Sequence, residues 1–242
     1  MPRRDPKPES LEMLRDVSTA TIANSLLSRG FKNVCLQGLQ ALDRTQPSMV
    51  GPAYTLRFIP AREDLDDMSN YASDDNLHRR AIEECPPGAV LVIDAGGSSK
   101  ASSAGDVMAA RLGYRGAAGI VTDGGYRDTP GIVATKLPAY QAMTASPATV
   151  IALHPVELDG PIGCAGVGIY PGDIIVGDAD GVVAIPAALA DEVATAAYEV
   201  AQYERYVDIQ IAKGRPIFGL FPATEENQAE FEKWRQAGEP EN

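Results

Sequence analysis

The strongest constraint on the fold is a pair of continuously apolar runs in the middle of the chain, separated by one helical pattern. Residues 89–93 read AVLVI and residues 117–121 read AAGIV. Between them, the segment GDVMAARLGYRG spaces its apolar residues as a helix does. Strands without polar alternation that are joined by a helix are typical of a parallel sheet covered on both faces. The centre of the chain therefore predicts an α/β fold with parallel central strands and flanking helices.

The flanking segments predict further strands and helices of the same fold. We expect strands over residues 53–59 and 137–143, and a hairpin over residues 172–186 that turns at residues 178–181. The polar stretch over residues 62–75 is a loop or a frayed helix. Helices are expected over residues 10–17, 19–29, 77–85, 105–116, 127–135 and 186–213. We expect Ser10 to cap the first of them, and Ser18 or Thr19 to cap the second. A short amphipathic helix should end the tail.

Charge and composition exclude several classes of partner. The formal net charge of -12 argues against nucleic acid, because binding to phosphate backbones needs clustered Lys and Arg. No apolar run approaches the roughly 18 residues of a membrane span, and no apolar segment follows the two N-terminal arginines as in a signal peptide. The three cysteines are widely spaced, and this spacing argues against a disulfide framework. We expect a cytoplasmic protein with no membrane partner.

Side chains able to do chemistry gather after the two apolar strands. The first strand is followed by a Ser-rich loop and a helix that opens at Gly105 and Asp106, and the second ends at residues 123–125 before Arg127 and Asp128. In a parallel sheet, ligands bind at the carboxyl ends of the strands. We therefore expect both junctions at the functional edge, with a helix N-terminus that can hold a carboxylate. Gly105 would let the backbone come close to whatever binds there.

The side chains at the two junctions suit a metal and an anion. Asp106 and Asp128 are oxygen donors of the kind that Mg²⁺ and Mn²⁺ prefer, and Arg127 can hold a carboxylate or stabilise an enolate oxygen. The structural alternative for the first junction is a helix start with an acid in its first turn. For the second junction it is a surface Arg–Asp pair at a turn.

Other candidate residues favour structural roles. The run Asp178, Asp180, Gly181 begins like a calcium loop but lacks the rest, so a hairpin turn is preferred. His78 and His154 are too far apart in sequence for a local metal motif. Asp123 either supports the site or forms a turn with the two glycines after it.

The sequence resembles the RraA-like family, which includes the 4-hydroxy-4-methyl-2-oxoglutarate aldolases and related oxaloacetate decarboxylases. The matching motifs are STATIANSLL, VGPAYTLRF, GDVMAARLGYRGAAGIVTDGGYRD and GDIIVGDADGVVAIP. The third of these is the most specific, and the resemblance covers roughly residues 15 to 205. It implies a compact β/β/α swivelling-domain fold and a homotrimer or homohexamer. It also divides the chain into an N-terminal extension over residues 1–14, a catalytic domain over residues 15–213, and a C-terminal extension over residues 214–242. That extension should pack on the domain or on a neighbouring subunit.

The resemblance also implies a role for each site residue. Asp128 would bind the metal directly, Asp106 would hold water on the metal, and Arg127 would face the pyruvyl oxygens. The amides of Val107 and Met108 would take the substrate carboxylate. The implied activity is that of a Mg²⁺- or Mn²⁺-dependent lyase, which cleaves a small 2-oxo acid to pyruvate through an enolate, as aldolase or decarboxylase. The alternative is an RraA-type regulator that binds a ribonuclease and needs no catalysis.

Overall fold

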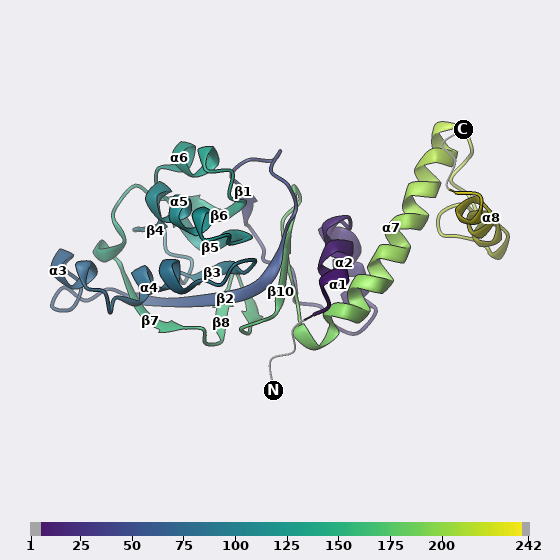
Figure 1. Ribbon diagram of the computed structural model, residues 1–242. Helices are drawn as coiled ribbons and strands as arrows, with labels where there is room; N and C mark the ends of the chain where they lie inside the picture. Colours follow the sequence, from purple (N-terminus) through teal and green to yellow (C-terminus); the bar gives the residue numbers. More distant parts are fainter. Residues whose placement is uncertain (1–5, 239–242) are drawn as a thin grey trace.

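The structure, a computed structural model, describes residues 6–238 and has a curled mixed sheet at its centre (Figure 1). Within these residues the sheet has nine strands, with the order β1-β6-β5-β3-β2-β10-β11; β4 pairs with β5 and β7 pairs with β2. Its strands are β1 (Gln40–Ala41), β2 (Met49–Pro60), β3 (Val90–Asp94), β4 (Ser102–Ala104), β5 (Gly119–Tyr126), β6 (Ala139–Thr144), β7 (Leu153–Leu158), β10 (Ile174–Gly177) and β11 (Val182–Ile185). A separate hairpin joins β8 (Ile162–Cys164) to β9 (Val167–Ile169).

The predicted parallel centre is confirmed. Strands β2, β3, β5 and β6 are parallel neighbours, and the hairpin of β10 and β11 is antiparallel. The expected end of β5 at residues 123–125 is wrong, because the strand continues through both glycines to the fully buried Tyr126. Glycine is needed there, since a Cβ on Gly124 would lie 2.7 Å from the Cβ of Ala95, and one on Gly125 would lie 2.9 Å from that of Ala145.

The helices follow the predicted segments with different ends. They are α1 (Pro8–Arg15), α2 (Thr19–Leu27), α3 (Met68–Ala72), α4 (Leu77–Glu84), α5 (Asp106–Tyr114), α6 (Thr129–Ala134), α7 (Ala190–Ala212) and α8 (Glu225–Gln236), with short 3₁₀ turns at Thr149–Ile151 and Ala187–Leu189. The predicted cap of α1 at Ser10 is wrong: Lys7 is the N-cap, and Pro8 suits the first turn. Ser10 instead donates from its hydroxyl to Asp191 of α7 at 2.7 Å.

The second helix and the hairpin support each other. Ser18 caps α2, as expected, and accepts a hydrogen bond from the amide of Thr21. The carboxylate of Asp178 accepts from the amide of Thr19 at 2.7 Å and from its hydroxyl at 2.8 Å, and it also accepts from the amide of Asp180 at 2.9 Å. The turn interpretation of residues 178–181 is thus confirmed, and the same carboxylate fastens α2 to the sheet.

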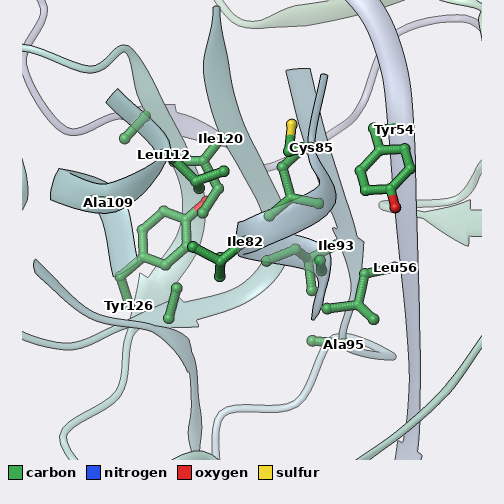
Figure 2. Packing of buried hydrophobic residues seen from close by; sticks show 14 of the residues in the cluster. Tyr54, Leu56, Ile82, Cys85, Ile93, Ala95, Ala109, Leu112, Ile120 and Tyr126 are labelled. Atoms are coloured by element: carbon green, nitrogen blue, oxygen red, sulfur yellow. The ribbon is translucent and has the colours of Figure 1, made fainter. Parts of the chain in front are cut away.

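Alternate side chains of the central strands fill two cores. Leu91 and Ile93 of β3 face α4 and α5, whereas Val90 and Val92 belong to the cluster on the other face, with the β8–β9 hairpin. Figure 2 shows the first core, where Ile82 of α4 packs in one cluster with β3 and β5 residues. This packing places α4 and α5 side by side over the same face of the sheet. A third core lies where α1, α2 and α7 cover β10 and β11.

The long helix α7 leaves the body of the molecule and carries α8 near its far end (Figure 1). A small aromatic cluster joins the two helices, made of Tyr203, Tyr206, Val207, Leu220, Phe231 and Trp234. The tail therefore packs on the far half of α7. No helix within residues 6–238 combines the length and the apolar character needed to cross a membrane.

Candidate functional site

The two strand–helix junctions meet through β4, a short strand within the predicted Ser-rich loop. β4 pairs with the end of β5, and the amide of Arg127 donates to the carbonyl of Ala104 at 3.1 Å. This pairing brings Gly105 against the second junction. A Cβ on Gly105 would lie 3.2 Å from Nε of Arg127 and 3.3 Å from Oδ2 of Asp128. The close approach expected at Gly105 is therefore made by the side chains of the neighbouring junction.

The N-terminus of α5 forms one side of the site. Gly105 is its N-cap, and the amide of Ala109 makes the first helical hydrogen bond, to the carbonyl of Gly105 at 3.1 Å. The amides of residues 106–108 precede that bond, and a helix leaves such amides without an acceptor of its own. The amide of Val107 donates at 2.8 Å to Oδ1 of Asp106. A ligand carboxylate that used the Val107 amide would thus have to replace the Asp106 carboxylate.

Asp106 is held in place from the other side by α6. A Cβ on Gly131 would lie 2.7 Å from both Cβ and Oδ2 of Asp106, which is closer than side-chain carbons normally approach. Gly131 therefore makes room for the Asp106 side chain. Its only mark in the sequence is that a glycine stands inside a predicted helix, where alanine is preferred.

Asp128 has an unusual backbone conformation. Helix α6 begins at Thr129 rather than at Arg127, and Asp128 is its N-cap with φ 55° and ψ 36°, in the left-handed region. Few residues other than glycine adopt this region, although Asp and Asn tolerate it. The carboxylate makes no cap hydrogen bond and lies 3.3 Å from Nε of Arg127. Both side chains are about half exposed, and such a surface pair is worth less than about 1 kcal/mol, too little to explain the backbone conformation.

A cleft of about 850 Å³ opens beside these residues. Five of the predicted site residues line it: Gly105, Asp106, Val107, Met108 and Arg127. The sixth, Asp128, adjoins it through its contact with Arg127. Residues of α3 and α4, among them Tyr71 and Arg79, form another part of the wall, and no motif in the sequence places them at the site.

The carboxylates of the site fit Mg²⁺, a divalent cation that needs few protein ligands. Within residues 6–238, no group of three or more His, Cys, Asp and Glu side chains could enclose a metal ion. Mg²⁺ needs no such enclosure, because one or two carboxylates suffice when water and substrate complete its coordination. The half-exposed carboxylate of Asp128, next to Gly105 and Asp106, meets that requirement. A closed zinc site does not fit.

Three other candidate residues from the sequence, Asp123, His154 and His78, lie in contacts or in burial that suit structural roles. Asp123 lies inside β5, so the turn interpretation is wrong; its carboxylate accepts from the amides of Ala95 at 2.7 Å and Ala165 at 3.3 Å, and burial raises its pKa. His154 contacts Asp66 at 2.7 Å. His78 is completely buried, and burial lowers its pKa to about 4.

Comparison with known proteins agrees with this architecture. The family model described as "RraA-like: Aldolase/RraA" matches residues 19–184. A protein of Halalkalibacterium halodurans, named provisionally as a 4-hydroxy-4-methyl-2-oxoglutarate aldolase, is 39% identical over 142 residues, or 57% of this chain and 60% of that protein. The 4-hydroxy-4-methyl-2-oxoglutarate aldolase of Thermus thermophilus is 32% identical over 113 residues, or 47% of this chain and 68% of that enzyme. The match thus spans less than two thirds of the first relative's length.

A solved structure extends the similarity over most of the chain. The crystal structure of RraAS2 from Streptomyces coelicolor, described as an unusual member of the RNase ES inhibitor RraA protein family, is 34% identical. It superposes with a TM-score of 0.75 over 85% of this chain and 98% of that one. The family model, the relatives and the fold agree. The chain therefore belongs to the RraA-like family.

Proposed function

We propose that this protein is a divalent-metal-dependent lyase that cleaves a 2-oxo acid to pyruvate through an enolate. It would be of the 4-hydroxy-4-methyl-2-oxoglutarate aldolase type, with oxaloacetate decarboxylase activity. One observation supports it most: Asp106, Arg127 and the first amides of α5 line one cleft, with the left-handed Asp128 beside Arg127. The names of the aldolase relatives point the same way.

Each group would serve one part of the reaction. The amides that open α5 would bind the C1 carboxylate of the substrate. When the C3–C4 bond breaks, its electron pair moves to the C2 carbonyl and forms an enolate, whose oxygen Arg127 would stabilise. In the aldol substrate the C4 hydroxyl gives its proton to water in the same step, and C4 becomes the carbonyl of the second pyruvate. A Mg²⁺ or Mn²⁺ ion held by Asp128 would supply further Lewis-acid stabilisation of that charge. Protonation at C3 then gives pyruvate. The co-product is a second pyruvate from 4-hydroxy-4-methyl-2-oxoglutarate and CO₂ from oxaloacetate.

The hydrogen bond between Asp106 and Val107 supports a link between binding and proton transfer. In the free protein the Asp106 carboxylate accepts from the Val107 amide. A substrate carboxylate at that amide would displace the Asp106 side chain and leave it free to hold water. Asp106 would then orient the water that exchanges a proton with C3.

The test is release of pyruvate from oxaloacetate and from 4-hydroxy-4-methyl-2-oxoglutarate, with Mg²⁺ or with EDTA. We expect activity with Mg²⁺ and none with EDTA. Asp128→Asn and Asp128→Gly keep a residue that tolerates the left-handed backbone, so both should fold while kcat falls by about 100-fold or more. Arg127→Ala should cause a similar loss. No pyruvate from the wild type with Mg²⁺, or full activity in these variants, would contradict the proposal.

A second candidate is a protein-binding regulator of ribonuclease activity. The similarity to RraAS2, which covers more of this chain than the aldolase matches do, is the observation that favours it. A regulator of this kind has no need for the Asp128 carboxylate. Inhibition of a ribonuclease E-type enzyme that persists in Asp128→Asn, together with no pyruvate release by the wild type, would favour this candidate over the lyase.

A further inference from the structure

Part of the cleft wall comes from α3 and the start of α4, outside the motifs that carry the proposed chemistry. Tyr71 of α3 is half-buried, and its phenol lies within electrostatic range of the guanidinium groups of both Arg127 and Arg79. Burial is the largest influence on Tyr71 and raises its pKa, so the hydroxyl stays protonated at neutral pH. The wall thus presents a hydrogen-bond donor near two cations.

The four arginines that line the cleft differ in how far they are neutralised. Arg80 contacts both carboxylate oxygens of Glu84, at 2.6 and 3.2 Å. Arg111 likewise makes a two-point contact with Glu83, with its shortest distance at 2.7 Å. In a bidentate pair of this kind, two N–H donors on one edge of the guanidinium bind the two carboxylate oxygens. These two cations are already matched by a carboxylate.

The guanidinium groups of Arg79 and Arg127 are less completely neutralised by carboxylates. Arg79 contacts the carbonyl of Ala72 and, at 3.2 Å, Asp74, both through Nη1. The Asp74 side chain is fully exposed, so water and salt weaken that pair. Arg127 lies 3.3 Å from Asp128 through Nε, and no side-chain hydrogen bond of the described residues joins the two. Each of these two guanidinium groups therefore keeps further donors for an anion in the cleft.

Hydrogen bonds and ring contacts hold the wall around Arg79 in place. Asn76 caps α4 and accepts from the amides of His78 and Arg79. The buried ring of His78 lies edge-on to Phe58 and to Tyr71, with ring centroids 5.2 and 6.1 Å apart. Because these contacts fix the positions of Tyr71 and Arg79 before a ligand arrives, little ordering is needed on binding.

We propose that Arg79 and Tyr71 form a second carboxylate subsite, which selects 2-oxo acids that carry another carboxylate beyond C3. The subsite rests on the proposed function, since it takes the C1 end of the substrate to lie at Arg127 and α5. A dicarboxylic substrate would then bridge the two incompletely matched cations of the cleft. A monocarboxylic 2-oxo acid would fill only the first.

The test compares a dicarboxylic substrate with matched monocarboxylic compounds in the presence of Mg²⁺. The substrates are 4-hydroxy-4-methyl-2-oxoglutarate and 4-hydroxy-2-oxopentanoate, which lacks the second carboxylate. In addition, exchange of the pyruvate methyl protons in D₂O reports enolate formation at the first site alone. We expect Arg79→Gln to raise KM for the dicarboxylate by about tenfold or more, as for loss of a charge-assisted hydrogen bond, and to leave proton exchange and the monocarboxylate unchanged.

Arg80→Gln is the matched control, because it removes a cation from the same helix that Glu84 already neutralises. It should leave KM for the dicarboxylate unchanged. Tyr71→Phe should raise that KM severalfold, and Arg79→Lys should recover part of the loss. Equal KM values in the wild type and Arg79→Gln, with normal pyruvate exchange, would overturn the subsite alone. Absence of pyruvate exchange in the wild type would instead overturn the proposed function.

Discussion

Gly131 is the residue through which α6 positions Asp106, and it allows activity to be separated from stability. A methyl group at this position would meet Asp106 at 2.7 Å and displace its carboxylate. Within a helix, however, alanine is more favourable than glycine by about 1 kcal/mol. We expect Gly131→Ala to lower pyruvate release by about tenfold or more, because a shift of about 1 Å in a catalytic group is enough. The Cβ of Asp106 cannot rotate away from the new methyl group, so the clash offsets the gain in helix preference and the thermal midpoint should stay the same or fall slightly.

Gly113→Ala is the control for this change. Gly113 also lies in a helix, α5, but nothing stands within 4 Å of the position that its Cβ would take. The substitution should raise stability without loss of activity. If Gly131→Ala retained full activity, the position of Asp106 would not matter to the reaction.

The site residues show which features a sequence can reveal. Asp106, Arg127 and Asp128 were predicted from their types and from their place after apolar strands, and the structure brings them together. Gly131 was missed because its role depends on the distance between α5 and α6. The left-handed backbone of Asp128 was missed for a similar reason, since Asp is equally common in ordinary helix caps.

The secondary structure elements likewise divide into those that the sequence predicts and those that it does not. Continuous apolar runs predicted β3 and the first part of β5, because a strand buried on both faces is made mostly of apolar side chains. β4 was missed because its three residues, Ser102–Ala104, carry no such pattern, and β5 supplies their partner. The sequence also could not predict that α3 forms part of the cleft wall. Its polar sequence fits a loop equally well, and its position depends on contacts with His78.

His78 at the start of α4 should make the stability of the protein depend on pH. Burial lowers its pKa to about 4 in the folded chain, against an ordinary value of about 6.5 in the unfolded one. Between these values the unfolded chain binds a proton that the folded chain does not. The free energy of unfolding should therefore be unaffected by His78 above pH 6.5 and fall as pH drops toward 4, by about 3 kcal/mol at most.

The measurement is urea unfolding at pH 7 and at pH 4.5 for the wild type and for His78→Gln. The variant is expected to be less stable at pH 7, because it disturbs the packing between Phe58 and Tyr71. Its loss of free energy between the two pH values should nevertheless be smaller than that of the wild type. Equal losses in both proteins would show that His78 does not carry this dependence.

The arrangement of the whole molecule separates a C-terminal lobe, residues 203–238, from the body. The sequence predicted both of its helices, yet it could not predict where the tail packs, because an amphipathic helix is compatible with any apolar partner. In the structure α8 lies on the far half of α7, away from the sheet (Figure 1). The lobe is held by one small aromatic cluster, by hydrogen bonds such as that from the Tyr203 hydroxyl to the carbonyl of Leu220, and by surface ion pairs. Arg215 pairs with Glu230 inside the lobe, and Arg235 pairs with Glu199 in the preceding part of α7.

The lobe should unfold before the body, and the chain carries a natural reporter for that event. Trp234 is its single tryptophan and lies in the lobe's cluster, against Phe231 and Tyr206. A small cluster and surface ion pairs stabilise less than the three cores of the body, so local opening should need less free energy than global unfolding. In a urea titration, the shift in tryptophan emission should therefore precede the loss of far-ultraviolet circular dichroism.

Phe231→Ala sharpens this experiment, because it removes a fully buried ring from the lobe and touches no residue of the body's cores. The fluorescence transition should move to lower urea, in line with the loss of about 3–5 kcal/mol that such truncations cause in a core. The transition of the body should stay where it is. Coincident transitions in both proteins would mean instead that the lobe unfolds together with the body, held by contacts beyond its own cluster. A neighbouring subunit, on which the sequence predicted that the tail could pack, would be the first partner to examine.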